Sequence, residues 1–300
     1  MRLNRRAFVQ GSLATGLLAG ASACVPLDQS TTGRLAASLR IIEADAGGTL
    51  GAEFFDTGTG LSVGLNRDAR FGHCSSFKTS LAAMVLQYRE QHGDLVREVP
   101  LREEDVVGHS PFVRERIGES ASLFELAQAT QRLSDNAAAN ILLREMGGPE
   151  AMTAFWRSVG DTESRLDRIE PQLNNVPAGE VRDTTTARAM ARTVATLIYG
   201  DTLREVDRSH LRHWMIDTST GLRRVRSGLP QDWQAGDKTG TSIWPGMGSL
   251  YVDIGFVEPT GRAPITFAAY FRAAEQTDGI DPEAESVLAR VGQVLARFAR

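Results

Sequence analysis

Segments with the pattern of β-strands occur at both ends of this chain, and a long helical stretch separates them. Strands must lie side by side to form a sheet, so the two ends of the chain have to fold together. The strand-like segments, bounded by turn residues, are 49–55, 61–65, 233–239, 249–257 and 265–271. This order predicts one discontinuous α/β domain with an all-helical domain inserted into it.

Helical patterns flank the strands and fill the middle of the chain. Leu35, Leu39 and Ile42 recur at helical spacing, and an apolar stripe over 287–298 predicts a closing amphipathic helix. In the middle, helical periodicity predicts helices over 76–90, 123–134, 137–146, 150–159, 185–199 and 203–215.

The domain boundaries follow from this order, and one loop stands out. We expect residues 34–70 and 214–300 to form the α/β domain, and residues 71–213 to form the helical domain. Residues 160–183 contain two prolines and little periodicity. A loop of that length inside a compact domain is usually functional or disordered, so 160–183 is a candidate part of a site.

The first residues have the pattern of an export signal. Residues 1–23 hold three arginines and no acid, residues 5–8 (R-R-A-F) resemble a twin-arginine signal, and residues 21–23 (A-S-A) fit a cleavage site. The apolar run is too short and too weakly apolar to span a membrane. We expect export to the periplasm of a Gram-negative-type bacterium, followed by a polar linker over 24–33. Cys24 leaves two outcomes open, a lipid-anchored lipoprotein and a freely soluble product.

Charge, cysteines and histidines exclude several classes of function. Removing residues 1–23 takes away three arginines and changes the formal charge from −4 to −7, which argues against a nucleic-acid binder. The two cysteines are Cys24 and Cys74, and because a terminal Cys24 is a poor partner we expect no disulfide in the mature fold. His210 and His213 lack a third ligand at a recognisable spacing, so we expect a solvated helix face and no metal.

One segment matches the sequence of a nucleophile motif but lacks the flanking elements that the motif needs. Residues 60–64 spell G-L-S-V-G, the pattern of a nucleophile elbow, which needs a strand before it and a helix after it. A loose turn precedes this segment and a strand-like run follows it. The favoured interpretation is therefore a polar Ser62 on a hairpin strand.

Lysine is almost absent from the chain, and both lysines fall in motifs. Of 33 basic residues, 31 are arginines, and the other two are Lys78 and Lys238. Ser75 and Lys78 are spaced to share a helix face, where a lysine of lowered pKa can accept the serine proton and an arginine cannot. An S-D-N motif at 134–136 and a K-T-G motif at 238–240 follow in order.

Together, the three motifs are the signature of class A β-lactamases and penicillin-binding proteins. The chain resembles the class A serine β-lactamases over residues 35–298. Residues 71–78 resemble the start of the family's nucleophile helix, 170–174 (E-P-Q-L-N) resemble its E-x-x-L-N segment, and Arg168 and Asp183 match its loop-clamping ion pair. The resemblance implies a sandwich of an antiparallel sheet and terminal helices, with the active site between it and the inserted helical domain.

The resemblance also implies the reacting groups. Ser75 attacks the β-lactam carbonyl, with the backbone N–H groups of Ser75 and Thr241 as the oxyanion hole. Lys78 is either the base for this step or a proton relay, and Glu170 acting through water is the rival. Glu170, with Asn174 fixing a water molecule, then hydrolyses the acyl-enzyme.

Further residues are implied to handle the leaving nitrogen and the substrate. Ser134 gives a proton to the ring nitrogen, and Lys238 supplies positive charge near it and near the substrate carboxylate. By the same resemblance, the substrate contacts are Asn136, Asn174, Thr239, Thr241, Arg224 and His109. Arg223 and Arg226 are alternatives to Arg224 as the contact for the substrate carboxylate. His109 stands where the family often has an aromatic residue.

We expect a monomeric class A β-lactamase that acts on penicillins, cephalosporins or both, without cofactor or metal. A D-alanyl-D-alanine peptidase would share the three motifs, but the 170–174 segment speaks against it. A non-catalytic β-lactam sensor would be acylated and stop. Carbapenem-hydrolysing branches often pair a cysteine after K-T-G-T with the one before the nucleophile, whereas Ser242 stands there, so the sequence gives that activity no clear support.

Overall fold

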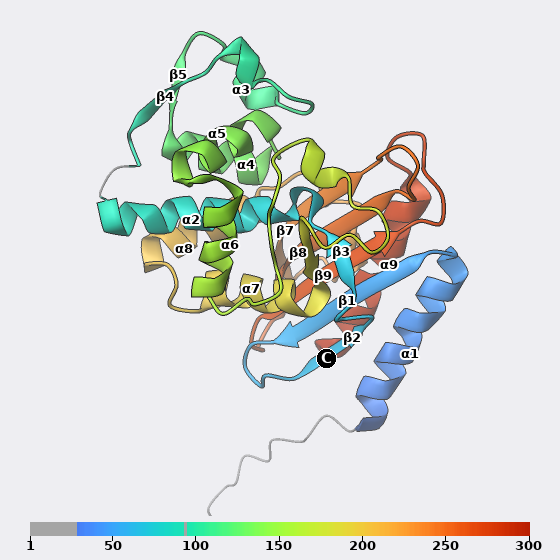
Figure 1. Ribbon diagram of the computed structural model, residues 1–300. Coiled ribbons are helices and arrows are strands. Elements are labelled where there is room, and N and C mark those ends of the chain that lie inside the picture. The colour runs from blue at the N-terminus through green and yellow to red at the C-terminus, as the bar shows by residue number, and fades with distance from the viewer. Residues whose placement is uncertain (1–28, 93–94) are drawn as a thin grey trace, which may run out of the picture.

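The computed structural model describes residues 29–92 and 95–300, in which helices cover both faces of a sheet (Figure 1). Within those residues, the largest sheet is antiparallel with the strand order β2–β1–β9–β8–β7. Its strands are β1 Thr49–Asp56, β2 Ser62–Leu65, β7 Gln234–Ser242, β8 Leu250–Glu258 and β9 Ile265–Arg272. Strands from the two ends of the chain meet where β1 pairs with β9, which confirms the predicted discontinuous α/β sandwich.

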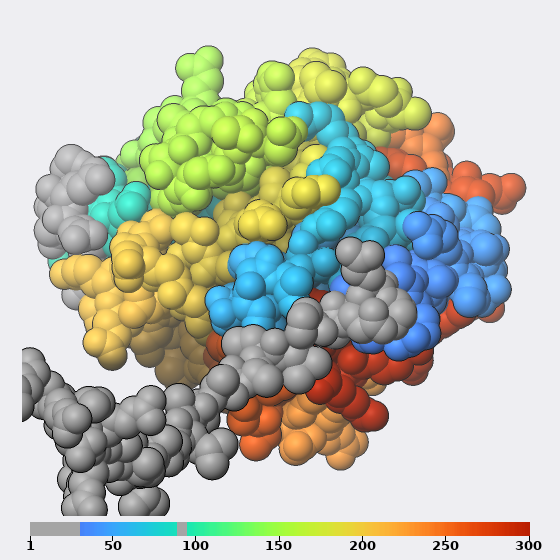
Figure 2. All heavy atoms as spheres, turned by 90° about the horizontal axis from the view of Figure 1, so that it is seen from below, coloured from blue at the N-terminus to red at the C-terminus, as the bar shows by residue number. Residues whose placement is uncertain are grey.

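The two terminal helices cover one face of this sheet. They are α1 Gln29–Ala46 and α9 Pro282–Phe298, and Figure 2 shows the blue amino-terminal residues beside the red carboxyl-terminal ones. Strand β8 is buried on both faces, because Tyr251 and Val257 pack with these helices whereas Ile254 packs into the core on the other side.

The other face carries the helical layer. Helix α7 (Ala187–Tyr199) lies against β9, β1 and β8, and the long helix α2 (Phe77–His92) runs through the centre of the layer. The helices that pack around α2 are α4 Leu123–Arg132, α5 Asn136–Met146, α6 Gly148–Ser158 and α8 Glu205–Ile216. Their apolar faces and the sheet share one continuous core.

Short elements connect these layers and position the site. The described short elements are β3 Arg70–Gly72, η1 Cys74–Ser76, β4 Glu98–Pro100, η2 Glu103–Asp105, α3 Pro111–Glu115, β5 Ser120–Ser122, η3 Gln172–Asn174, β6 Thr184–Thr186 and η4 Val225–Gly228. Strand β3 pairs with β6, and β4 pairs with β5. The β3–β6 pair matters for function because it brings the segment before Ser75 to the end of the 160–183 loop.

The structure differs from the predicted boundaries at three places. Helix α1 begins at Gln29, inside the predicted linker 24–33, and Arg34 Nη2 donates to Thr31 Oγ1 at 2.9 Å within its first turns. The predicted boundary between 213 and 214 falls inside α8. Helix α7, which was assigned to the helical domain, packs on the sheet.

Other predictions concern single residues and the first segment. Ser62 begins β2 and pairs with Phe55, which confirms the hairpin-strand interpretation. The predicted export signal, residues 1–23, and Cys24 lie outside the described residues. Among the residues that are described, none of the helices combines the length and apolar character needed to cross a bilayer.

Candidate active site

The turn that carries Ser75 is held from two sides. Backbone N–H of His73 donates to the Asp183 carbonyl at 3.0 Å, and the Ser76 N–H donates back to the His73 carbonyl at 3.0 Å. On the other side lies Gly240 of β7, where an added Cβ would stand 2.8 Å from the Ser75 nitrogen. Only glycine lets β7 approach the Ser75 backbone this closely.

Cys74 precedes Ser75 with a positive φ of 47°, and its thiol is buried. Burial raises the pKa of this thiol to about 12. A thiol with so high a pKa holds no thiolate at neutral pH, so Cys74 acts as a packing residue beside the nucleophile turn.

Lys78 lies one turn after Ser75 on α2 and is fully buried. Its Nζ donates to Ser75 Oγ at 3.0 Å, to the Ser134 carbonyl at 2.9 Å and to Asn136 Oδ1. The same nitrogen lies 3.0 Å from Glu170 Oε1. A buried ammonium needs this many acceptors to offset its lost hydration.

The S-D-N motif lies in the turn between α4 and α5. Ser134 has a positive φ of 58°, and Asp135 is the N-cap of α5, accepting from Ala138 N at 2.8 Å. The other oxygen of Asp135 accepts from the Phe112 N–H at 2.8 Å. Asp135 thereby fixes the turn, which directs Ser134 and Asn136 toward Lys78.

Lys238 meets Ser134 from the opposite wall. Its Nζ donates to Ser134 Oγ at 3.0 Å and to the Thr239 carbonyl at 2.7 Å. Burial lowers the pKa of this ammonium well below its usual value, and the nearby charge of Lys78 lowers it further, while Asp237 acts in the opposite direction. The two lysines of the chain therefore share one electrostatic site.

Glu170 reaches this site from the 160–183 loop, and its side chain is 1% exposed. Asn140 of α5 holds its backbone twice, since Glu170 N donates to Asn140 Oδ1 and Asn140 Nδ2 donates to the Glu170 carbonyl, both at 2.9 Å. The Glu170–Pro171 peptide bond is cis. Asn174 Nδ2 donates to Glu170 Oε2 at 2.7 Å, so the two carboxylate oxygens contact Lys78 and Asn174 respectively.

These side chains open onto one cleft of about 650 Å³ between the helical layer and β7. The predicted residues that line the cleft are Ser75, His109, Ser134, Asn136, Glu170, Asn174, Arg224, Thr239 and Thr241. Lys78 and Lys238 lie directly beneath it, in contact with Ser75 and Ser134. The arrangement combines a hydroxyl, a buried amine and a buried carboxylate, as acyl transfer followed by hydrolysis requires.

Known proteins share this sequence and fold. The chain matches a family model described as the β-lactamase enzyme family over residues 34–299. A β-lactamase of Streptomyces fradiae is 40% identical over 98% of this chain and 96% of its own length. An ancestral (GNCA) class A β-lactamase of known structure is 42% identical, with a TM-score of 0.83 over 88% of this chain and 99% of its own. The chain belongs to the class A β-lactamases.

Further relatives agree with this assignment. The carbapenem-hydrolyzing β-lactamase KPC of Klebsiella oxytoca is 40% identical over 84% of this chain and 85% of its own length. A β-lactamase structure from Xanthomonas campestris is 40% identical, with a TM-score of 0.83 over 90% of this chain and 99% of its own. A class A β-lactamase is a serine hydrolase that opens the β-lactam amide and so confers antibiotic resistance.

Among the competing arginines of this β-lactamase, Arg224 is the one that hydrogen-bonds to Gly240 and Thr241 of β7. It is almost fully buried, and it donates to Thr241 Oγ1 at 2.7 Å, to the Gly240 carbonyl at 2.8 Å and to Glu285 Oε1 at 3.2 Å. Arg226 instead points to Asp237, at 3.5 Å. The cleft thus has a rigid cationic end.

Two buried acids lie behind that cationic end. Burial raises the pKa of Asp237 to about 6, although the charges of Arg226 and Lys238 oppose this shift. Burial and the neighbouring Asp237 also raise the pKa of Asp253, whose Oδ2 accepts from Val225 N at 3.0 Å. The Asp237 carboxyl fills the space beside Gly221, where an added Cβ would stand 1.6 Å from Oδ2.

Sequence reasoning missed several polar residues of the cleft, among them Thr220 and Glu285. Thr220 Oγ1 lies 2.6 Å from Thr239 Oγ1, and Glu285 holds Arg224 from the first turns of α9. Neither residue belongs to a motif, and Glu285 is 61 positions from its partner. A charged residue in the first turn of an amphipathic helix is ordinarily solvated, so the pattern gave no signal.

His109 lines the mouth of the cleft, as the sequence predicts, and is exposed. One ring nitrogen, Nε2, lies 3.0 Å from the Leu133 carbonyl, and Asn136 N donates to the His109 carbonyl at 2.8 Å. The predicted metal-free helix face contains His210, which packs edge-on against Phe124, and His213. Over the described ranges, no three His, Cys, Asp or Glu side chains gather as metal ligands.

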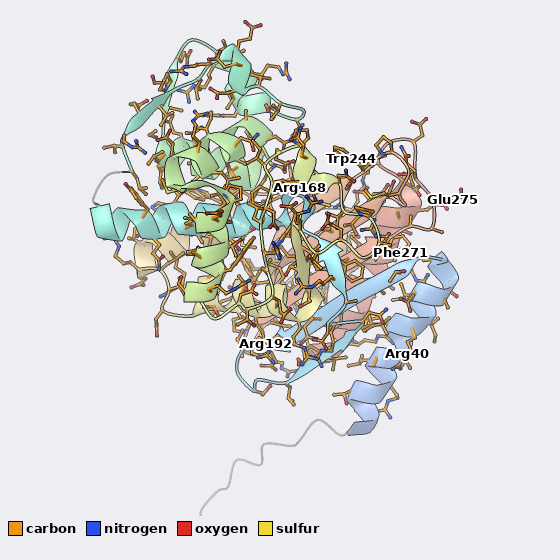
Figure 3. The ribbon with its side chains drawn as sticks, in the orientation of Figure 1. Arg40, Arg168, Arg192, Trp244, Phe271 and Glu275 are labelled. Atoms are coloured by element: carbon orange, nitrogen blue, oxygen red, sulfur yellow. The ribbon has the colours of Figure 1, made fainter. Side chains whose placement is uncertain are left out.

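The predicted ion pair of the 160–183 loop forms. Arg168 Nε donates to Asp183 Oδ2, and Asp183 Oδ1 accepts from the backbone N–H groups of Asp167 at 2.7 Å and Arg168 at 2.9 Å. Arg168 Nη2 also donates to the Asn175 carbonyl at 2.8 Å. Figure 3 shows Arg168 between the helical layer and the sheet, where it closes the loop that carries Glu170.

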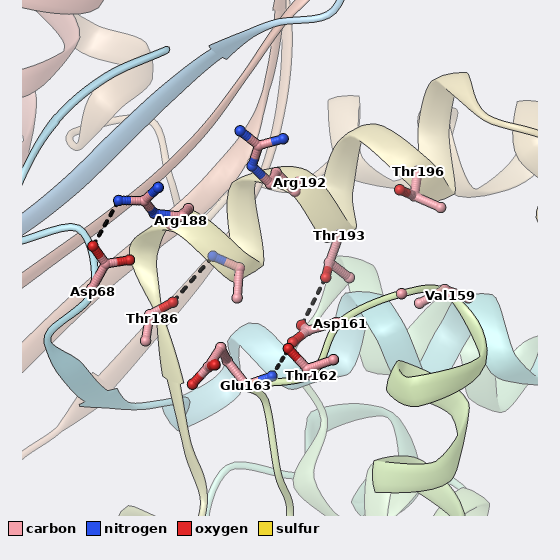
Figure 4. A pocket seen from close by; sticks show the side chains of 12 residues that line it. Asp68, Val159, Asp161, Thr162, Glu163, Thr186, Arg188, Arg192, Thr193 and Thr196 are labelled. Carbon is pink, nitrogen blue, oxygen red and sulfur yellow. Dashed lines mark hydrogen bonds and ion pairs between the residues drawn. The ribbon is translucent and has the colours of Figure 1, made fainter. Parts of the chain in front are cut away.

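A second buried acid anchors the start of the same loop (Figure 4). Asp161 is 5% exposed and accepts from Thr193 Oγ1 at 2.8 Å, from Ser164 Oγ at 2.6 Å, and from the N–H groups of Glu163 and Ser164 at 2.9 Å. It lies at the edge of a separate cavity of about 500 Å³ beneath α7. That cavity does not include Ser75, so Asp161 has a structural role.

Replacing Asp161 by alanine should destabilise the protein by about 2–4 kcal/mol, because several hydrogen bonds to a buried carboxylate are lost together. Urea unfolding measures this loss. The matched control is Glu163→Ala, which removes an acid that is 48% exposed and paired with Arg70, and such a surface pair contributes about 0–1 kcal/mol. Equal losses in the two variants would contradict the anchoring role.

Proposed function

We propose that this β-lactamase hydrolyses penicillins, cephalosporins or both through an acyl-enzyme on Ser75, which water activated by Glu170 then hydrolyses. The observation that carries this proposal is the placement of Glu170. Its carboxylate is buried, contacts Lys78 Nζ at 3.0 Å and Asn174 Nδ2 at 2.7 Å, and lines the same cleft as Ser75.

In the acylation step, Ser75 Oγ attacks the β-lactam carbonyl and its proton leaves through Lys78 Nζ, 3.0 Å away. An ammonium cannot take this proton, so Lys78 either begins the step as a neutral amine or first passes one of its own protons to Glu170, which lies 3.0 Å away on its other side. The backbone N–H groups of Ser75 and Thr241 stabilise the oxyanion, each contributing about 10²–10³ in rate.

The carbon–nitrogen bond of the ring then breaks, the nitrogen takes a proton from Ser134, and the proton that left Ser75 through Lys78 replaces it on Ser134. The Lys238 ammonium donates to Ser134 Oγ at 3.0 Å and stabilises the negative charge that develops there. Arg224, Thr239 and Thr241 bind the ring carboxylate, while Asn136 holds the side-chain amide of the substrate.

Deacylation needs a base close to the ester. A water molecule held by Glu170 and Asn174 attacks the acyl carbonyl, and Glu170 accepts its proton. The ester bond breaks, Glu170 returns the proton to the Ser75 oxygen through Lys78, and the opened antibiotic leaves. A general base of this kind contributes about 10²–10⁴ in rate, which separates a hydrolase from an enzyme that stays acylated.

The two rival functions make a different prediction in one assay. Mature protein is mixed with a chromogenic cephalosporin, and the number of substrate molecules opened per protein is counted. We expect hundreds of turnovers. A single stoichiometric burst would contradict the proposal and favour a sensor or a D-alanyl-D-alanine peptidase.

We also propose that the enzyme is exported to the periplasm and acts as a monomer. The arginine pair at residues 5–6 and the small residues at 21–23 support export. Intact-mass measurement of protein from the periplasmic fraction should give a chain that begins at Cys24, with or without lipid. Retention of residues 1–23 would contradict export with cleavage. Export that is unaffected by changes at Arg5 and Arg6, and is lost only when other residues are changed, would contradict the role of the arginine pair.

A further inference from the structure

The cleft continues past Arg224, where two exposed apolar side chains line it beside polar ones. Leu222 and Ile280 are 58% and 54% exposed, and both line the cleft. The other large apolar side chains that are exposed in the described ranges line no part of it. Exposed hydrocarbon at one end of a polar cleft is typical of a surface that contacts a ligand.

An ion pair fixes the two segments that carry these side chains. Leu222 directly precedes Arg223, whose Nε lies 2.8 Å from Glu285 Oε2. Ile280 directly precedes Asp281, the N-cap of α9, the helix to which Glu285 belongs. Glu285 also pairs with Arg224 through its other oxygen, at 3.2 Å, so this ion-pair network holds a preformed pair of apolar side chains beside the cationic end of the cleft.

The direction of a bound β-lactam follows from the reacting groups. With its carbonyl at Ser75 and its carboxylate at Arg224, the ring runs along the cleft toward Leu222. The acylamino side chain points the other way, toward Asn136 and His109, which line the opposite end. A substituent on the ring carbon next to the carboxylate-bearing carbon therefore extends past Arg224.

We propose that Leu222 and Ile280 form a subsite for an uncharged apolar group, above all an aromatic one, on that ring carbon. This proposal rests on the proposed function and names a substrate class, cephalosporins with an aryl-bearing group at ring position 3. The two methyl groups of a penicillin at the corresponding carbon are too short to cover both side chains. The subsite therefore discriminates between substrates by the apolar surface that they bury.

The test uses two cephalosporins with the same acylamino side chain, one with hydrogen and one with an aryl-vinyl group at position 3. We expect the kcat/KM ratio of the aryl-vinyl over the hydrogen compound to fall roughly five- to tenfold in Leu222→Ser/Ile280→Ser, because partly exposed side chains contribute less than a closed pocket. Because the ratio is compared between the unmodified enzyme and the variant, the different intrinsic reactivities of the two compounds cancel.

The control variant is Val206→Ser, which removes a 50% exposed apolar side chain on α8, outside the cleft. Its ratio should equal that of the unmodified enzyme. A ratio within twofold of the unmodified enzyme in the double variant would overturn the subsite. If the unmodified enzyme turned over neither compound, the proposed function would be overturned instead. The two failures are therefore distinguishable.

Discussion

Replacing Glu170 by glutamine should lower the turnover of a penicillin by about 10³-fold, in the middle of the range for loss of a general base. The amide keeps the shape of the carboxylate but cannot accept a proton from water. Ser75 and Lys78 remain in contact, so the acyl-enzyme still forms. It should accumulate, and intact-mass spectrometry should show the protein heavier by one whole penicillin molecule.

The matched control is Glu163→Gln in the same loop. Glu163 is partly exposed, pairs with Arg70 and lines the cavity beneath α7 instead of the cleft. This variant should turn over penicillin at the normal rate and show no adduct. Unmodified Glu170→Gln protein after exposure to penicillin would contradict the role of Glu170 in deacylation. Thermal unfolding of both variants should accompany the assay, because Glu170→Gln removes the counter-charge of the buried Lys78.

Much of the architecture followed from the sequence because the two patterns are distinct. The nearly continuous apolar run of β8 is typical of a strand buried on both faces, and the helical spacing of α9 buries one face of a helix. The predicted strand over 233–239 ended too early. Strand β7 extends to Ser242 because Gly240 and its neighbours continue to pair with β8, although glycine weakens the strand pattern.

Tertiary contacts made by residues outside the motifs could not be predicted. Asn140 looks like an ordinary polar position of α5, yet it holds both backbone groups of Glu170. Asp161 lies at the start of the loop and belongs to no motif, and its partner Thr193 lies 32 positions away. Such pairs depend on how the loop folds back on α5 and α7, and local spacing carries no signal of that.

The cleft also depends on residues that the sequence marks only as glycine. Gly240 lets β7 reach the Ser75 turn, and Gly221 makes room for the buried carboxyl of Asp237. In each case, the reason for glycine is a backbone or side chain from a distant segment. The sequence therefore predicted which groups react, whereas the structure was needed to show which contacts hold these groups in position.

Replacing Lys78 by arginine should lower kcat/KM by about 10³-fold, because arginine keeps the positive charge but cannot accept the proton of Ser75. The guanidinium is also larger than the buried space that Nζ occupies between Ser75 Oγ, Asn136 Oδ1 and Glu170 Oε1. The loss should fall on acylation. Intact mass should then show slow formation of the adduct, in contrast to the rapid formation expected of Glu170→Gln.

The only other lysine provides the control. Lys238 has the role of a cation beside Ser134, so Lys238→Arg preserves its charge and should cost about tenfold or less, as a displaced charge-assisted contact. Equal losses in the two variants would mean that both sites need a compact ammonium and neither needs a proton acceptor. Rapid adduct formation in Lys78→Arg would contradict proton transfer through Lys78, and rapid formation in Glu170→Gln would exclude Glu170 as the obligatory acylation base. The two adduct rates therefore separate the two routes by which the Ser75 proton can leave.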